Sequence, residues 1–236
     1  MQRYAGIRAC GAFCMEEDMD EGLLREYGIT IFKGSEEEKE IWMISIIGEI
    51  EGHECANERV KTTKYEHMLP ILAYAEESEE VAGILFLIHT VGGDVSCGLA
   101  LAECIAGLRK PTVSLVIGDS HSIGVPLSVA ARETIIAPSA TVIIHPVRLN
   151  GVVLGAPQTY EYFELIQDRI TSFIAKHTGV SEEQIKEWMV SPGILTRDLG
   201  TIFVGEDAVK AGLYHKVGGI KDALDALHRM IAIIDK

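Results

Sequence analysis

The sequence predicts an α/β fold in which a mostly parallel sheet is buried on both faces. Three apolar stretches, at residues 41–47, 83–88 and 112–117, are continuous rather than alternating, and helical patterns lie between them. A strand that is apolar at every position has no solvent-facing side, which is typical of parallel strands with helices on both faces. The length of 236 residues is enough for one large domain with a sizeable core.

The first forty residues differ from the rest of the chain. Two acidic clusters, residues 15–21 and 35–40, flank a short segment of mixed composition. Such a segment buries too little apolar area to offset the entropy lost on ordering. We therefore expect residues 1–40 to form a poorly anchored N-terminal arm and residues 41–236 to form the principal domain.

Helices and strands are expected to alternate after the first strand. Thr63 is expected to cap a helix over residues 63–75, in which Pro70 marks a kink or a helix start. A helix of small residues is expected from residue 94 to 108, and Lys110-Pro111 separates it from the strand at 112–117. The next elements are a short helix to residue 131 and strands at 133–136 and 140–145.

A long helix is expected over residues 157–177. Its apolar and aromatic residues are spread wider than one core-facing stripe, and they are Tyr160, Phe163, Ile166, Ile170, Phe173 and Ile174. One face is then expected to pack on the domain and another on a second subunit, which predicts a homo-oligomer. A capping box at Ser181 and Gln184 starts a short helix, another is expected near residues 207–211, and an amphipathic helix covers residues 220–234.

Composition excludes several classes of protein. The net charge of −14 argues against nucleic acid as a partner, because phosphates would be repelled. No apolar run approaches the roughly 20 residues of a membrane span, and the N-terminus shows no signal-peptide pattern. Five cysteines without regular spacing indicate reduced thiols in the cytoplasm. Cys10 and Cys14 have no matching pair of ligands nearby, so we expect no metal, and we expect no cofactor.

The stretch Gly-Asp-Ser-His-Ser-Ile-Gly-Val-Pro at residues 118–126 carries the clearest chemical pattern. An apolar strand breaks at a glycine, and an alanine-rich helical pattern starts directly after Ser122. A serine on a sharp strand-to-helix turn exposes its hydroxyl as a nucleophile. His145 ends another apolar strand 23 residues later and is the best-placed base for the serine proton. Together they predict a serine hydrolase.

Gly92 and Gly93 end a third apolar strand. The backbone N–H of Gly93 and that of Ile123, the residue after the nucleophile, are expected to bind the oxygen on which negative charge develops. No P-loop or dinucleotide-binding pattern surrounds the glycines, so phosphate binding is not expected. His121 is a rival base, although adjacent side chains on a turn diverge, and His89 is more typical of packing or a loop contact.

These motifs resemble the three active-site motifs of the Clp protease proteolytic subunit. The segments are Thr-Val-Gly-Gly-Asp-Val at 90–95, His-Ser-Ile-Gly at 121–124 and Ile-Ile-His-Pro at 143–146, and the spacing from Gly-Gly to the serine fits without a gap. Further segments are similar to the TepA branch of that family, the translocation-enhancing proteins of spore-forming bacteria; they are residues 61–67, 121–126, 145–148, 155–159 and 196–201. The resemblance covers residues 42–235 and leaves residues 1–40 unmatched.

The resemblance implies a ClpP-like, crotonase-type fold of repeated ββα units, a Ser-His-Asp triad, and ring assembly through the helix at 157–177. It assigns the nucleophile, the base and the two oxyanion donors to Ser122, His145, Gly93 and Ile123. The acid it implies is Asp198, the only carboxylate between residues 187 and 206, although extra residues at 189–195 blur the alignment. Asp119 is the alternative acid.

The expected function is that of a cytoplasmic serine endopeptidase that cuts peptides or unfolded segments without ATP, with protein export as a candidate context. The glycine-flanked N-terminal loop that the Clp subunit presents to its unfoldase is absent, which argues against an unfoldase partner. Pro146, where the family usually has glutamine, and Val125-Pro126, in place of small residues, are expected to reshape the substrate groove.

Other functions stay open at this point. A protein with this fold can bind peptides as a scaffold without cleaving them, and the crotonase fold also supports acyl-CoA chemistry. A Ser-Lys catalytic dyad is not favoured, because no lysine is evident near the strand end that carries Ser122 or the one that carries His145. Ser122 paired with His145 favours hydrolysis over these alternatives.

Overall fold

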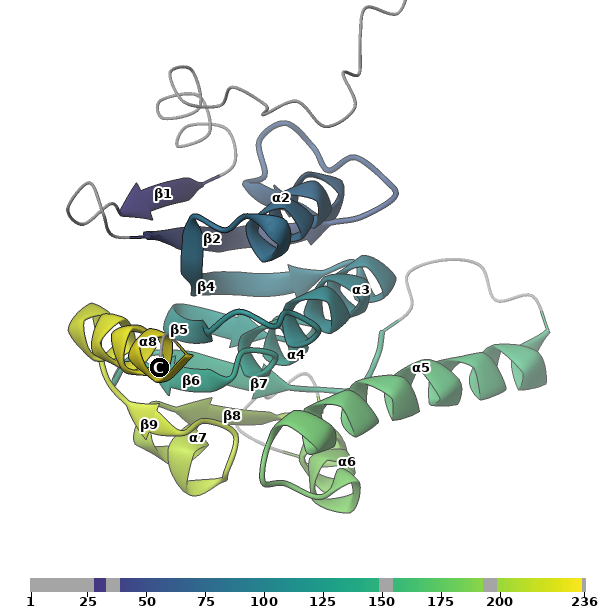
Figure 1. Ribbon diagram of the computed structural model, residues 1–236. Coiled ribbons are helices and arrows are strands. Elements are labelled where there is room, and N and C mark those ends of the chain that lie inside the picture. The colour runs from purple at the N-terminus through teal and green to yellow at the C-terminus, as the bar shows by residue number, and fades with distance from the viewer. Residues whose placement is uncertain (1–27, 33–38, 149–154, 193–198, 235–236) are drawn as a thin grey trace, which may run out of the picture.

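The computed structural model describes residues 28–32, 39–148, 155–192 and 199–234 (Figure 1). The strands are β1 (Ile29–Phe32), β2 (Glu40–Glu51), β3 (Thr62–Lys64), β4 (Val81–Gly93), β5 (Thr112–His121), β6 (Glu133–Ile136), β7 (Thr141–Ile144), β8 (Thr201–Val204) and β9 (Lys216–Val217). The helices are α2 (Tyr65–Glu77), α3 (Val95–Ala106), α4 (Gly124–Val129), α5 (Ala156–His177), α6 (Glu182–Val190), α7 (Glu206–Lys210) and α8 (Ile220–Ile234).

The strands form one sheet with the order β1-β2-β4-β5-β6-β9. Strand β3 pairs with β2, and β7 pairs with both β5 and β8. All pairs are parallel except β1 with β2 and β7 with β8. The predicted α/β class with a mostly parallel sheet is therefore confirmed.

Helices cover both faces of the sheet, as continuous apolar strands require. Helices α2, α3 and α4 pack together on one face, over a core that includes Ile44, Phe86 and Val116. Helix α8 packs on the other face, against β4, β5 and β6, where Leu85 and Leu115 are buried (Figure 1). The first half of β5 is thus buried on both faces, and Ser122 follows its more exposed carboxyl end.

Helix α5 projects away from the body of the molecule (Figure 1). Its C-terminal half packs on the core through Ile170, Phe173 and Ile174. In the other half, Tyr160 is 64% exposed and Leu165 is 58% exposed. The predicted long helix is thus present, with its apolar residues divided between a buried half and an exposed half.

Two local features differ from what the sequence led us to expect. Residues 29–32, inside the segment expected to be a poorly anchored arm, form an edge strand that pairs with β2, and Ile29 is buried. Thr63 does not cap α2, because its hydroxyl exchanges hydrogen bonds with the backbone N–H and C=O of Ile47 instead. None of the described helices is long and apolar enough to cross a membrane.

Candidate active site

Ser122 lies on the sharp turn between β5 and α4. Its φ of 58° makes it the one residue other than glycine with positive φ in the described part of the chain. The turn is held by two hydrogen bonds: the Ser122 N–H donates to Ile143 O at 2.9 Å, and the Val125 N–H donates to Ser122 O at 3.0 Å. A positive φ at a non-glycine residue costs free energy and is concentrated at functional sites. The predicted strand–serine–helix turn is therefore present in the fold.

Gly92 packs directly against this turn, and Gly93 packs against β2. A Cβ added to Gly92 would lie 2.8 Å from Ser122 Cβ and 3.4 Å from the Ile123 backbone nitrogen. Both glycines also have positive φ, and a Cβ on Gly93 would overlap the Ile50 carbonyl. No larger residue fits at either position without moving the backbone of β2 or of the serine turn.

The pairing of β4 fixes the direction of the Gly93 N–H. Gly93 pairs with Ile50 of β2, and the Asp94 N–H donates to Ile50 O at 3.0 Å. In such a parallel pair Ile50 makes the hydrogen bonds on both sides of Gly93, whose own N–H then points to the opposite edge of the strand. The Gly93 N–H is therefore not used in the pairing with β2.

His145 follows β7 directly, two residues after the carbonyl that binds the Ser122 N–H. Its Nδ1 lies 2.7 Å from the backbone oxygen of Pro146. A carbonyl oxygen only accepts hydrogen bonds, so Nδ1 carries the proton of the neutral ring. Nε2 is then the basic nitrogen, which is the tautomer that a base for serine requires.

Comparison with known proteins identifies the family of this chain. The family model described as Clp protease matches residues 39–221, most of the chain. The chain belongs to the Clp protease family. It is 51% identical over 195 residues to the translocation-enhancing protein TepA of Halalkalibacterium halodurans, covering 83% of this chain and 76% of that protein.

More distant members of the Clp protease family are similar as well. The ATP-dependent Clp protease proteolytic subunit 1 of Protochlamydia amoebophila is 28% identical over 152 residues, which cover 62% of this chain and 70% of that protein. Among solved structures, a ClpP1 variant from Listeria monocytogenes superimposes with a TM-score of 0.60 at 21% identity, covering 77% of this chain and 94% of that one. The last likeness confirms the ClpP-like fold.

His121, the rival base in this Clp-family chain, takes part in a separate network. The Thr141 hydroxyl donates to Asp119 Oδ1 at 2.8 Å, so its oxygen accepts from His121 Nε2, also at 2.8 Å. Burial lowers the pKa of His121, against the opposing effect of Asp119, and His145 and His89 lower it further. Nε2 of His121 therefore acts as a donor to Thr141, which favours His145 as the base.

Asp119, the alternative acid, belongs to the same network. Besides Thr141 it contacts His89, whose Nε2 lies 3.3 Å from Asp119 Oδ2. Burial of the carboxyl group raises its pKa, but the hydrogen bond from Thr141 and the nearby His121 and His89 outweigh this effect, so the pKa of Asp119 is lowered. These contacts hold the carboxylate on β5 and argue against its use as the partner of His145.

Asp198, the acid implied by the family resemblance, lies outside the described residues. Gly200, two positions later, packs on His145: a Cβ on Gly200 would lie 2.9 Å from His145 Cβ and 2.7 Å from Ile144 O. Gly200 lies inside the family-like segment 196–201, but no sequence pattern indicated its contact with His145.

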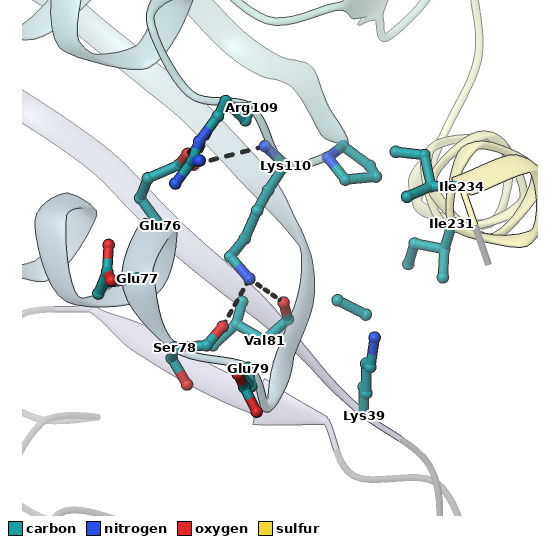
Figure 2. Close-up of a pocket in the computed structure, with 12 residues that line it drawn as sticks. Lys39, Glu76, Glu77, Ser78, Glu79, Val81, Arg109, Lys110, Ile231 and Ile234 are labelled. Carbon is teal, nitrogen blue, oxygen red and sulfur yellow. Dashed lines mark hydrogen bonds and ion pairs between the residues drawn. The ribbon is translucent and has the colours of Figure 1, made fainter.

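A cavity of about 340 Å³ lies beside Val81, at the opposite end of β4 from Gly93 (Figure 2). Figure 2 shows Lys110 pointing at its wall, where Nζ donates to the carbonyl oxygens of Ser78 and Val81 at 2.6 Å each. Arg109 donates from Nε to Glu76 beside it. These two cations hold the C-terminal end of α2 against the start of β5. The cavity contains none of the candidate catalytic residues.

The described residues contain no group of three or more His, Cys, Asp or Glu side chains placed to hold a metal ion. The structure places a strained serine after β5, two close-packed glycines at the end of β4, and a histidine with its basic nitrogen defined after β7. That set of groups is suited to acyl transfer through a serine nucleophile.

Proposed function

We propose that this Clp-family protein is a serine endopeptidase that cleaves peptides or unfolded segments without ATP. In this proposal Ser122 attacks the scissile carbonyl, and His145 Nε2 takes the hydroxyl proton and later gives it to the leaving amine. The Gly93 and Ile123 N–H groups bind the oxyanion, and Asp198 stabilises the charged His145 ring. The observation that carries the proposal is the strained Ser122 turn pressed against Gly92 and tied to β7.

The cellular role and the assembly form part of the same proposal. We propose that the protein acts in the cytoplasm and is linked to protein export, and its likeness to the translocation-enhancing protein TepA supports the link to export. The exposed half of α5 carries Tyr160, Tyr162 and Leu165, each more than half exposed, which is typical of a surface that packs on a second subunit. We propose that α5 joins copies of this chain into a homo-oligomer.

A fluorophosphonate probe tests the chemistry directly. The purified protein is expected to react at a single site, which peptide mass spectrometry assigns to Ser122, and to hydrolyse a fluorogenic peptide in the absence of ATP. Ser122→Ala removes both signals, and His145→Ala slows both nearly as much, because the two groups act as one unit. His121→Ala, the matched control on the same turn, keeps most of the rate.

The outcomes separate the endopeptidase from a peptide-binding scaffold. A folded wild-type protein that neither reacts with the probe nor hydrolyses peptides would leave the scaffold as the function. Labelling that survives Ser122→Ala would remove this serine from the mechanism. A loss of activity in His121→Ala alone would move the base assignment from His145 to His121.

A further inference from the structure

Strand β4 contains a bulge just before its two glycines. Gly48 of β2 pairs with Thr90, but the next residue, Glu49, pairs with Gly92, so Val91 has no partner in β2. Val91 is correspondingly 58% exposed. A bulge rotates the residues that follow it and is often found next to active sites. Here it changes the direction in which Gly92 and Gly93 present their backbone groups.

The Thr90 hydroxyl bridges this bulge. It donates to Gly48 O at 2.5 Å and accepts from the Gly92 N–H at 3.1 Å. Thr90 is completely buried, so water does not compete for these bonds. Its methyl group is fixed as well, because a Cβ on Gly124 of α4 would lie 2.7 Å from Thr90 Cγ2. One side chain thus connects β2, the glycine turn and the helix that follows Ser122.

The bridge determines which N–H is left to face the serine. The Gly92 N–H is bound to the Thr90 hydroxyl. The register of Gly93 with Ile50 leaves the Gly93 N–H out of the pairing with β2. Without the hydroxyl, the Gly92 N–H loses its acceptor, and the bulge at Val91 is held only by the pairing with β2 on either side of it.

We propose that Thr90 is a positioning residue for the reaction: its hydroxyl clamps the Val91 bulge and so aims the Gly93 N–H at the oxyanion. This inference rests on the proposed peptidase function. Thr90 touches no substrate atom in this role and acts only through the backbone of Gly92 and Gly93.

Two substitutions at Thr90 separate the hydroxyl from the shape. Thr90→Val keeps the volume and loses both hydrogen bonds, whereas Thr90→Ser keeps the hydroxyl. Loss of one oxyanion donor typically lowers the rate about 10²–10³-fold. We therefore expect Thr90→Val to lower kcat by about 10²-fold with KM nearly unchanged, and to weaken inhibition by a peptide boronate, whose tetrahedral adduct occupies the oxyanion site, by a similar factor. Thr90→Ser is expected to stay within about threefold of wild type.

Thr112→Val is the matched control. Thr112 is also buried, and its hydroxyl accepts from the Arg132 N–H at 3.0 Å, but it lies at the start of β5, far along the strand from Ser122. This variant is expected to lose stability and keep kcat. If Thr90→Val loses no more kcat than Thr112→Val, or if Thr90→Ser fails to restore the rate, the positioning role is wrong.

Hydrogen exchange gives a readout that does not depend on activity. Amide exchange measured by mass spectrometry on peptides that span residues 89–95 is expected to be faster in Thr90→Val than in wild type, and unchanged in Thr90→Ser and Thr112→Val. Unchanged exchange in Thr90→Val would overturn the clamp. A wild-type protein without hydrolysis or labelling would instead refute the peptidase proposal, while the exchange data would still decide whether Thr90 holds the bulge.

Discussion

Gly92→Ala tests whether close packing between the glycine turn and Ser122 sets the geometry of the site. Gly92 has a φ of +94°, and an added Cβ would lie 2.8 Å from Ser122 Cβ and 2.9 Å from His121 O. Carbon atoms in contact prefer about 3.5–4.0 Å, so the serine turn must shift by roughly 0.5–1 Å. A displacement of about 1 Å at a reacting centre costs on the order of 10² in rate.

Gly212→Ala separates the effect of backbone strain from the effect of the collision. Gly212 has a similar φ of +85°, but an added Cβ would meet Val180 Cγ2 at 3.4 Å, an ordinary contact. Both variants carry the cost of a left-handed residue, about 1–2 kcal/mol. Only Gly92→Ala adds overpacking of about 1–3 kcal/mol, so its total loss of unfolding free energy is expected to be about 2–5 kcal/mol.

Urea unfolding and the rate of fluorophosphonate labelling, measured on both variants, check this prediction. Gly212→Ala is expected to lose about 1–2 kcal/mol of stability and to keep its labelling rate. Gly92→Ala is expected to stay folded, because a domain has about 5–15 kcal/mol to lose, and to be labelled about a hundredfold more slowly. Equal labelling rates in the two variants would show that the contact between Gly92 and Ser122 does not position the nucleophile.

Three further predictions concern strain, pH and assembly. Ser122→Gly is expected to be more stable than Ser122→Ala by about 0.5–1 kcal/mol in urea unfolding, because glycine relieves the backbone strain at a φ of 58°. Equal stabilities of the two variants would contradict that strain. Burial lowers the pKa of His121 below its ordinary value of 6.5, so His121 binds a proton more readily in the unfolded state, and the protein is expected to lose stability as the pH falls below about 6.5. His121→Gln is expected to weaken this loss of unfolding free energy, measured by urea unfolding at several pH values. An unchanged pH dependence in the variant would contradict the prediction. Replacing Tyr160 and Leu165 together by glutamate is expected to lower the mass measured by light scattering with unchanged circular dichroism, and a wild-type monomer at micromolar concentration would contradict assembly through α5.

The sequence was sufficient to predict the sheet and its helices because hydrophobic periodicity is a local property. Continuous apolar runs predicted β2, β4 and β5, and the Ser181 capping box predicted the start of α6, where the Ser181 hydroxyl accepts from the Gln184 N–H at 3.2 Å. The short strands β8 and β9 were not predicted. They consist of four and two residues, and their pairing with β7 and β6 depends on contacts far apart in the sequence.

The placement of the candidate residues in the fold was predicted in part for the same reason. Ser122, Gly93 and His145 stand at ends of apolar strands, and the carboxyl ends of parallel strands meet at one edge of a sheet. The role of Thr90 depends on a register shift between β2 and β4, which no pattern in the sequence reveals. The Asp119 network depends on the pairing of β5 with β7, which brings Thr141 beside Asp119. Pairing between strands, rather than residue type, decides both features.

The backbone carbonyl of Pro146 determines the loss of activity that we expect from the last variant, Asp198→Asn. In a serine triad the acid accepts a hydrogen bond from His Nδ1, and replacing it by asparagine lowers turnover about 10⁴-fold because the ring takes the wrong tautomer. In this protein the backbone oxygen of Pro146 already accepts from His145 Nδ1 at 2.7 Å, and a carbonyl holds the same tautomer as a carboxylate. The variant should therefore keep the correct tautomer and lose only the negative charge beside the protonated ring. We expect a fall in kcat of about 10²–10³, the usual size of one lost electrostatic interaction in an active site. A fall of about 10⁴ would mean that Nδ1 leaves Pro146 for Asp198 when substrate binds, and an unchanged kcat would leave Ser122 and His145 as a dyad oriented by the Pro146 carbonyl.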